Sequence, residues 1–237
     1  MARYLVLSGY DNNMKAVGDR CTPTHQAYAI HHGYEHEVVR EYLPTTHPSH
    51  QKIRLLRERI DQYDAIMWLD ADTVVMGVQS IDQWDWREVT KSFDPSLMLH
   101  RVMDISVDWC APLDDDTPQP PANAMPISTT YVSCSNFILW NTPNTKRFLD
   151  EWDRQSERYA VRDICCWEQD GLRAAMKASD WFNRLVFRHN RRTFNAVHET
   201  CVNRNFPDRA PMPYQPGDFL LHLTNVDRDA ILTSLGL

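Results

Sequence analysis

Two aspartates one residue apart follow an apolar run, and their spacing could support metal chemistry. The stretch reads IMWLDADTVVM from Ile66 to Met76, with carboxylates at Asp70 and Asp72. Such a pair could cap the next element, begin a calcium loop or bind another divalent cation. An EF-hand calcium loop is excluded, because it needs a glycine and further oxygen ligands where this chain turns apolar. Mg²⁺ or Mn²⁺ would take both carboxylates and keep coordination sites open for phosphate oxygens.

The segments around these aspartates predict the sheet that must position them. Five apolar residues precede Asp70 without alternation, which is typical of a strand covered on both faces. Strand patterns at 4–7, 36–42 and 64–76 alternate with helical patterns at 23–32 and 49–63. This order predicts an α/β fold with helices flanking a central, mostly parallel mixed sheet. Ligands of open α/β sheets bind beyond the carboxyl ends of the strands, where Asp70 and Asp72 would lie.

The second half of the chain continues the pattern around one long loop. We expect strands at 96–102, 132–141 and 217–225, and helices at 142–159, 166–178 and 228–237. The loop at 108–127 is rich in Pro and Asp, and loops of this length are usually functional or mobile. Neither an internal repeat nor a long linker divides the sequence, so residues 1–237 are expected to form a single domain.

Composition restricts the function classes. The chain has 237 residues, 43% of them hydrophobic, and a net charge of -7, which permits a large core. There is no basic run for a nucleic-acid backbone, and no apolar stretch of about 18 residues for a membrane span. Six cysteines without a C-x-x-C pair indicate reduced thiols rather than structural zinc. We therefore expect a soluble cytoplasmic protein.

Several segments resemble the motifs of one enzyme family, in the same order along the chain. They are YAIHHGY (28–34), QKIRLL (51–56), LDADTVVM (69–76), SNFILWNTPNTKRFLDEW (135–152), EQDGL (168–172) and GDFLLHLTN (217–225). They resemble retaining nucleotide-sugar glycosyltransferases of the GT-A fold, in particular the group that contains galactosyl/mannosyltransferases and xyloglucan xylosyltransferases. The resemblance implies a single Rossmann-like GT-A domain, and the absence of an anchor suggests a version from a bacterial cytosol or a virus-infected cell.

The chain departs from this group at two places. Ser133-Cys134-Ser135 stands where the group usually has N-x-G, and Asn225 stands where a glycine usually follows the terminal histidine. Asn tolerates a positive φ better than most residues, so the turn after the last strand can be kept.

The resemblance implies a metal site and a donor site. Asp72 and His222 would hold Mn²⁺, which suits imidazole better than Mg²⁺ does, and Asp70 would bridge the metal and the ribose. Gly9 would let a nucleotide approach the backbone, and the Tyr10 ring would stack on the base. The nucleotide-sugar-binding residues would be Ser8, Gly9, Tyr10, Lys52, Asp70 and Arg228, with Lys52 contacting the donor sugar or diphosphate and Arg228 clamping the diphosphate.

Three polar residues that open the helix at 166–178 are the expected catalytic group. Retaining chemistry needs a group that stabilises or attacks an oxocarbenium-like carbon. The resemblance gives this role to Glu168 or Gln169, and gives Asp170 a contact to sugar hydroxyls. Tryptophans at 84, 86 and 109 would be sugar platforms or core residues.

The sequence thus predicts a metal-dependent retaining glycosyltransferase with a UDP- or GDP-linked donor. The acceptor hydroxyl could belong to a glycan, a lipid, a protein or a hydroxylated DNA base, although the net charge does not favour DNA. A sugar-nucleotidyltransferase is an alternative, but SGYDNNMKAVGDR lacks the glycine-rich basic loop expected there. A non-catalytic carbohydrate-binding module would leave the D-x-D and E-Q-D motifs unexplained.

Overall fold

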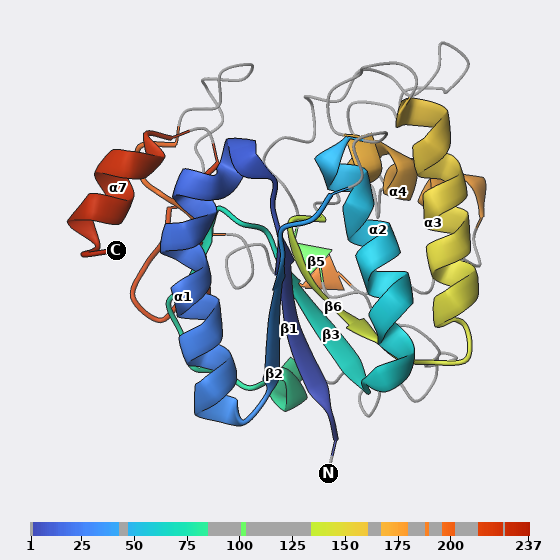
Figure 1. The fold of residues 1–237 in the computed structure, drawn as a ribbon, viewed down its shortest axis with the longest axis horizontal. Coiled ribbons are helices and arrows are strands. Elements are labelled where there is room, and N and C mark those ends of the chain that lie inside the picture. The colour runs from blue at the N-terminus through green and yellow to red at the C-terminus, as the bar shows by residue number, and fades with distance from the viewer. Residues whose placement is uncertain are drawn as a thin grey trace, which may run out of the picture.

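The computed structural model has a mixed, mostly parallel sheet with helices on both faces, as predicted (Figure 1). The described residues are 2–42, 47–84, 101–102, 134–160, 167–179, 188–189, 196–201, 213–224 and 226–237. The sheet has the order β2-β1-β3-β6, with β1 at Tyr4–Gly9, β2 at Glu35–Val39, β3 at Ala65–Leu69 and β6 at Asn136–Trp140. β1 is parallel to β2 and β3, and β6 is antiparallel to β3.

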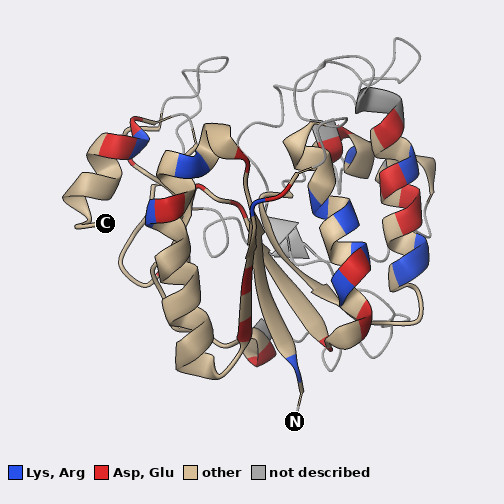
Figure 2. Cartoon of the chain, in the orientation of Figure 1, with Lys and Arg blue, Asp and Glu red and all other residues tan. Residues whose placement is uncertain are grey.

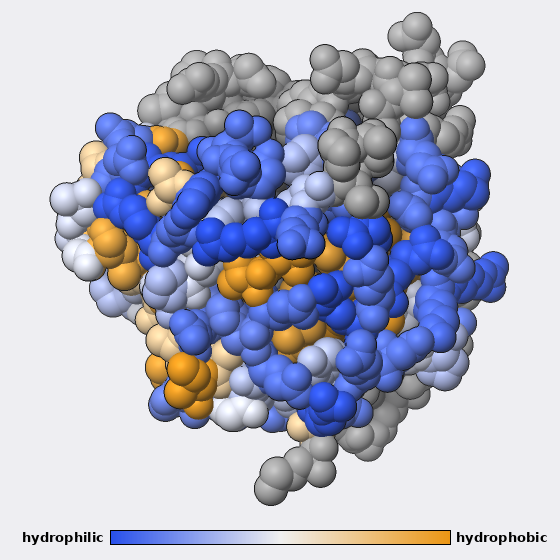
Figure 3. Space-filling model, viewed as in Figure 1, coloured by the Kyte–Doolittle hydropathy of each residue, from blue (hydrophilic) through white to orange (hydrophobic). Residues whose placement is uncertain are grey.

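Helices cover the two faces unequally. α1 (Lys15–His32) lies on one side of the sheet, and α2 (Pro48–Arg59), α3 (Thr145–Ala160) and α4 (Trp167–Ala178) lie on the other (Figure 1). Acidic and basic residues are interspersed along α2 and α3 (Figure 2). The visible described surface is mostly hydrophilic, with small separate apolar areas (Figure 3).

Alternation along the central strands explains why both faces are buried. Leu5 and Leu7 of β1 belong to the core on the α2 and α3 side, whereas Val6 belongs to the core that contains Tyr28 and Ala29 of α1. Successive side chains of a strand point to opposite faces, so a continuous apolar run supplies both cores.

The predicted strand at 64–76 is in fact two strands in different sheets. β3 ends at Leu69, a turn follows in which the Thr73 amide donates to the Asp70 carbonyl oxygen at 3.0 Å, and β4 occupies Thr73–Val75. β4 pairs antiparallel with β9 (Leu220–His222), and β9 is parallel to β8 (Ala196–Val197). The chain leaves the first sheet at the two aspartates, because the turn directs the following residues toward β9.

The first helix is longer than its sequence pattern indicates. α1 begins at Lys15 rather than at Pro23, and Pro23 lies inside it. Proline removes a backbone hydrogen bond and strains a helix interior. Packing offsets this cost, because Cys21, Thr22 and His25 on either side of Pro23 are buried.

The remaining elements are short. Helical turns occupy Asn12–Met14, Ile60–Gln62 and Ile81–Trp84, β5 (Arg101–Val102) is parallel to β7 (Arg188–His189), and α7 spans Arg228–Ser234. Among the described cysteines, Cys21, Cys134 and Cys201 are buried free thiols. No helix in the described ranges is long and apolar enough to cross a membrane. The predicted loop at 108–127, Asn225, and the tryptophans at 86 and 109 lie outside the described residues.

Candidate active site

The three predicted metal ligands meet beyond the carboxyl end of β3. Asp70, Asp72 and His222 each offer a ligand atom, and these atoms lie within 4.8 Å of one another. Strand pairing explains the meeting, because Thr73 of β4 is paired with His222 of β9. The Leu223 amide also donates to the Asp72 carbonyl oxygen at 2.8 Å. Two carboxylates and an imidazole fit a divalent cation such as Mn²⁺.

The carboxylates of the turn have unlike surroundings. Burial would raise the pKa of Asp72, but His222 Nε2 at 3.3 Å and Arg228 Nη2 at 2.8 Å hold that pKa well below its ordinary value. Burial raises the pKa of Asp70, against the opposing effect of Lys52, and the charge of Asp72 raises it further. A cation between the two carboxylates would offset their mutual repulsion.

Lys52 of α2 is buried below the turn and holds it in place. Its Nζ donates to the Cys134 carbonyl oxygen at 2.7 Å and to Glu168 Oε1 at 2.9 Å, and lies 3.0 Å from Asp70 Oδ1. The ammonium group thus contacts oxygens from three different segments, two of them through hydrogen bonds and Asp70 through an ion pair. This arrangement supports a positioning role for Lys52, and its expected contact with the donor stays a prediction.

The three predicted catalytic residues separate into two environments. Burial would raise the pKa of Glu168, but Lys52 keeps it below its ordinary value, so this carboxylate is ionised. Gln169 Oε1 accepts from the Cys134 amide at 3.4 Å. Asp170 is buried and lies 3.0 Å from Arg173 Nη1 on the same helix. Glu168 is thus joined to Asp70 through one ammonium group, whereas Asp170 is engaged within α4.

A buried histidine that the sequence did not single out supports the same turn. His25 Nε2 lies 2.7 Å from the Thr73 carbonyl oxygen, and its Nδ1 lies 2.8 Å from Ser8 Oγ. Burial lowers the pKa of His25 to about 4, so the ring is neutral and donates through Nε2 to the carbonyl. Ser8 is fully buried and also lies 2.9 Å from the Leu69 carbonyl oxygen. Its hydroxyl therefore links the ends of β1 and β3, and the expected contact of Ser8 with a nucleotide stays a prediction.

The Tyr10 ring, which is expected to stack on a nucleotide base, is covered by other parts of the chain in this structure. It is 3% exposed, and its hydroxyl donates to Asp19 Oδ1 at 2.8 Å. The Arg40 guanidinium lies over the ring, 4.5 Å from its centroid, and Gly18 lies so close that a Cβ there would collide with the ring. Stacking on a base would require displacing Arg40.

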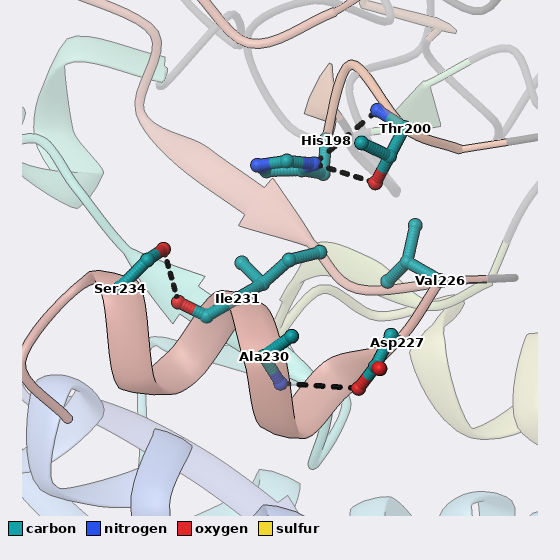
Figure 4. A pocket seen from close by; sticks show the side chains of 7 residues that line it. All are labelled: His198, Thr200, Val226, Asp227, Ala230, Ile231 and Ser234. Atoms are coloured by element: carbon teal, nitrogen blue, oxygen red, sulfur yellow. Dashed lines mark hydrogen bonds between the residues drawn. The ribbon is translucent and has the colours of Figure 1, made fainter.

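A cavity of about 680 Å³ lies beside α7 rather than at the aspartates. Figure 4 shows His198 and Thr200 on one side of it, and Val226 and Ile231 on the other. His198 follows Val197, which is paired with His222, and so the cavity is adjacent to the metal ligands along the strand. Its described lining residues are His198, Thr200, Val226, Asp227, Ala230, Ile231 and Ser234.

The arrangement of sheet, turn and helices has counterparts among solved structures. A glycosyltransferase involved in the glycosylation of the major capsid of PBCV-1 matches with a TM-score of 0.60 at 13% identity, over 99% of this chain and 98% of the other. The chain has the GT-A fold. The galactosyltransferase LgtC, in complex with donor and acceptor sugar analogues, matches with a TM-score of 0.54 at 15% identity, over 98% and 94% of the two chains.

Mouse xyloside xylosyltransferase 1 has the same architecture. Its TM-score is 0.53 at 12% identity, and the match covers 94% of this chain and 98% of the mouse chain. No protein-family model and no curated protein matches the sequence. These structures confirm the GT-A fold that the family resemblance implied.

Proposed function

We propose that residues 1–237 form one catalytic domain, a metal-dependent glycosyltransferase that moves a sugar from a nucleotide diphosphate sugar to an acceptor hydroxyl. The observation that carries the proposal is the convergence of Asp70, Asp72 and His222 within 4.8 Å, beyond the carboxyl end of β3 in a GT-A fold. Ligands of open α/β sheets bind at such strand ends. The structural neighbours, which are glycosyltransferases, support the same class of activity.

Asp72 and His222 would hold Mn²⁺, and Asp70 would contact the metal and the donor ribose. When bound, the metal supplies a Lewis acid for the leaving diphosphate. Arg228 would bind the same diphosphate. Its Nη2 is 2.8 Å from Asp72 and its Nε donates to the Leu223 carbonyl oxygen at 3.0 Å, which leaves other N–H groups of the guanidinium for phosphate oxygens.

We infer that the reaction retains the donor's anomeric configuration. Glu168 is ionised and fixed by Lys52, so its negative charge could stabilise an oxocarbenium-like carbon. Gln169 lies beside it at the start of α4, and either residue could carry this role. Asp170 would bind sugar hydroxyls only after a change in its pairing with Arg173. The donor nucleotide would be UDP or GDP.

Donor hydrolysis tests the proposal without knowledge of the acceptor. Radiolabelled UDP- and GDP-sugars are incubated with the protein and Mn²⁺, and free sugar is measured. Chelator should abolish turnover, and Asp72→Asn should reduce it by about 10²-fold or more, because a Lewis acid worth several kcal/mol is lost. Asp153→Asn, at a carboxylate paired with Arg57 on the outer surface, is the matched control and should keep full activity.

Four outcomes would contradict the proposal or one of its parts. Full activity in excess chelator would exclude the metal role. Pyrophosphate exchange instead of sugar release would indicate a nucleotidyltransferase, and binding of sugars without turnover of any donor would indicate a binding module. Once an acceptor is found, a β-linked product from an α-linked donor, seen by NMR coupling, would exclude retention.

A further inference from the structure

Tyr42, which follows β2, presents a hydroxyl group without a hydrogen-bond partner in the described part of the chain. The residue is only partly buried. Its hydroxyl lies against Gly9, where a Cβ added to the glycine would collide with it. Gly9, at the end of β1, therefore leaves room for the tip of the Tyr42 side chain. A polar group held in this way and left unpaired is available to a ligand.

The charges around Tyr42 place it beside the candidate active site. Burial raises the pKa of Tyr42, the carboxylate of Asp70 raises it further, and the ammonium of Lys52 opposes both. These effects act only over short distances, so the hydroxyl is close to the turn that carries the metal ligands. Asp11, in the loop after β1, contributes in the same direction as Asp70.

The strand order gives the direction in which a donor would extend. β1 lies between β3 and β2 and is parallel to both, so their carboxyl ends are adjacent. Neighbouring strands are about 4.8 Å apart, which puts the end of β2 about two strand spacings from the metal ligands. A donor with its diphosphate at Asp70 and Asp72 would cross β1 at Gly9 and place its nucleoside near Tyr42.

We propose that the Tyr42 hydroxyl, for which Gly9 leaves room, hydrogen-bonds to the nucleoside half of the donor. This inference rests on the proposed function. Tyr42 would then take the place of Tyr10, whose ring is covered by Arg40, as the aromatic residue on the nucleoside side of the site.

The test compares Tyr42→Phe with Tyr63→Phe by calorimetric titration of UDP and GDP in the presence of Mn²⁺. Tyr42→Phe should raise the Kd of the nucleotide that binds the wild-type protein by about 3- to 10-fold, the effect of one hydrogen bond. It should leave the urea unfolding midpoint unchanged, because no hydrogen bond of the folded chain is lost. Tyr63→Phe, which removes a 2.7 Å bond to Glu35, should lower that midpoint slightly and leave the Kd unchanged.

Inorganic pyrophosphate with Mn²⁺ serves as the second probe, because it occupies the diphosphate site without a nucleoside. Its affinity should be equal in the wild-type protein and in Tyr42→Phe. Equal nucleotide affinity in the two proteins would overturn the inference and leave the proposed function standing. An equal loss for nucleotide and pyrophosphate would overturn it too, by assigning Tyr42 to the diphosphate. If the wild-type protein binds neither UDP nor GDP, the proposed function fails and the inference fails with it.

Discussion

Two charged clusters flank the Asp70–Asp72 turn, and their basic side chains differ in how much of their surface is exposed to solvent. We name the Lys52 cluster as Lys52, Asp70, Cys134 and Glu168, and the Arg228 cluster as Asp72, His222 and Arg228. The Lys52 side chain is 4% exposed, whereas that of Arg228 is 34% exposed. The ammonium contacts oxygens from three different segments, whereas two contacts of the guanidinium leave several of its five N–H groups for other acceptors.

The difference separates positioning from binding. A buried charge that has all its partners is costly to disturb, so the Lys52 cluster fixes where Asp70 and Glu168 lie. A partly exposed charge with unused donors can exchange partners at little cost, so the Arg228 cluster is suited to a substrate that arrives and leaves. The Asp70–Asp72 turn thus joins the Lys52 cluster, which is fixed in place, to the Arg228 cluster, which can exchange its partners.

Removal of Lys52 should cause the largest effect, a loss of unfolding free energy. Lys52→Met leaves the buried Glu168 and the partly buried Asp70 without their shared cation, and such losses cost about 3–5 kcal/mol of unfolding free energy. Urea unfolding measures the loss. The control is Lys146→Met, which removes an ion pair to Asp61 in which both side chains are more than half exposed and should cost under about 1 kcal/mol. A loss for Lys52→Met no larger than that of the control would refute the positioning role.

Acid should weaken the folded chain through His25, which contacts the Thr73 carbonyl oxygen next to the turn that joins the two clusters. Its pKa is about 4 in the folded chain and 6.5 ordinarily, because burial disfavours the charged ring. Between these values the unfolded chain binds a proton that the folded chain does not. The unfolding free energy should therefore fall as the pH falls from 6.5 to 4, by at most about 3 kcal/mol.

Unfolding of the wild-type protein and of His25→Gln at pH 7, 5.5 and 4.5 measures this contribution. The variant should be less stable at pH 7, because the bonds to Ser8 and Thr73 are disturbed, and its stability should depend less on pH over this range. Parallel pH profiles for the two proteins would mean that other groups titrate in this window.

Removal of Arg228 should affect function rather than folding, and this is the smallest of the three effects. Arg228→Met should change the unfolding free energy by less than about 1 kcal/mol, because the guanidinium is partly exposed and lies at a terminal helix. The KM for the donor should rise by about tenfold through loss of a charged contact to the diphosphate. Steady-state kinetics on the confirmed donor give the value, and Arg228→Lys should recover part of the affinity. A variant that loses stability but keeps the wild-type KM would contradict the assignment of substrate binding to the Arg228 cluster.

Those parts of the site that follow from local pattern were predictable. Asp70 and Asp72 are conspicuous because two carboxylates directly follow a fully apolar run, and the strand-helix order predicted an α/β fold, to which the family resemblance added the GT-A type. Lys52 was identified as a site residue, but residue spacing along a helix cannot show that its ammonium is buried between two carboxylates from distant segments.

Other features depend on tertiary contacts that have no local signal. The apolar residues after Asp72 read as a continuation of β3, since their pairing with β9 involves a segment far along the chain. His25 and Tyr42 occur in ordinary polar surroundings in the sequence, and they gain their roles only from what packs against them: Ser8 and Thr73 for His25, and Gly9 for Tyr42.

The pairing of Asp72 with Arg228 spans 156 residues and has a consequence for the order of events during synthesis. The first sheet needs β6 as its last strand, but β4 finds its partner only when β9 has emerged from the ribosome. Closing a loop of this length is slow and is compensated only by the contacts made at its end. The metal ligands therefore assemble last, and a nascent chain that lacks its final segment would hold the D-x-D turn without a metal site.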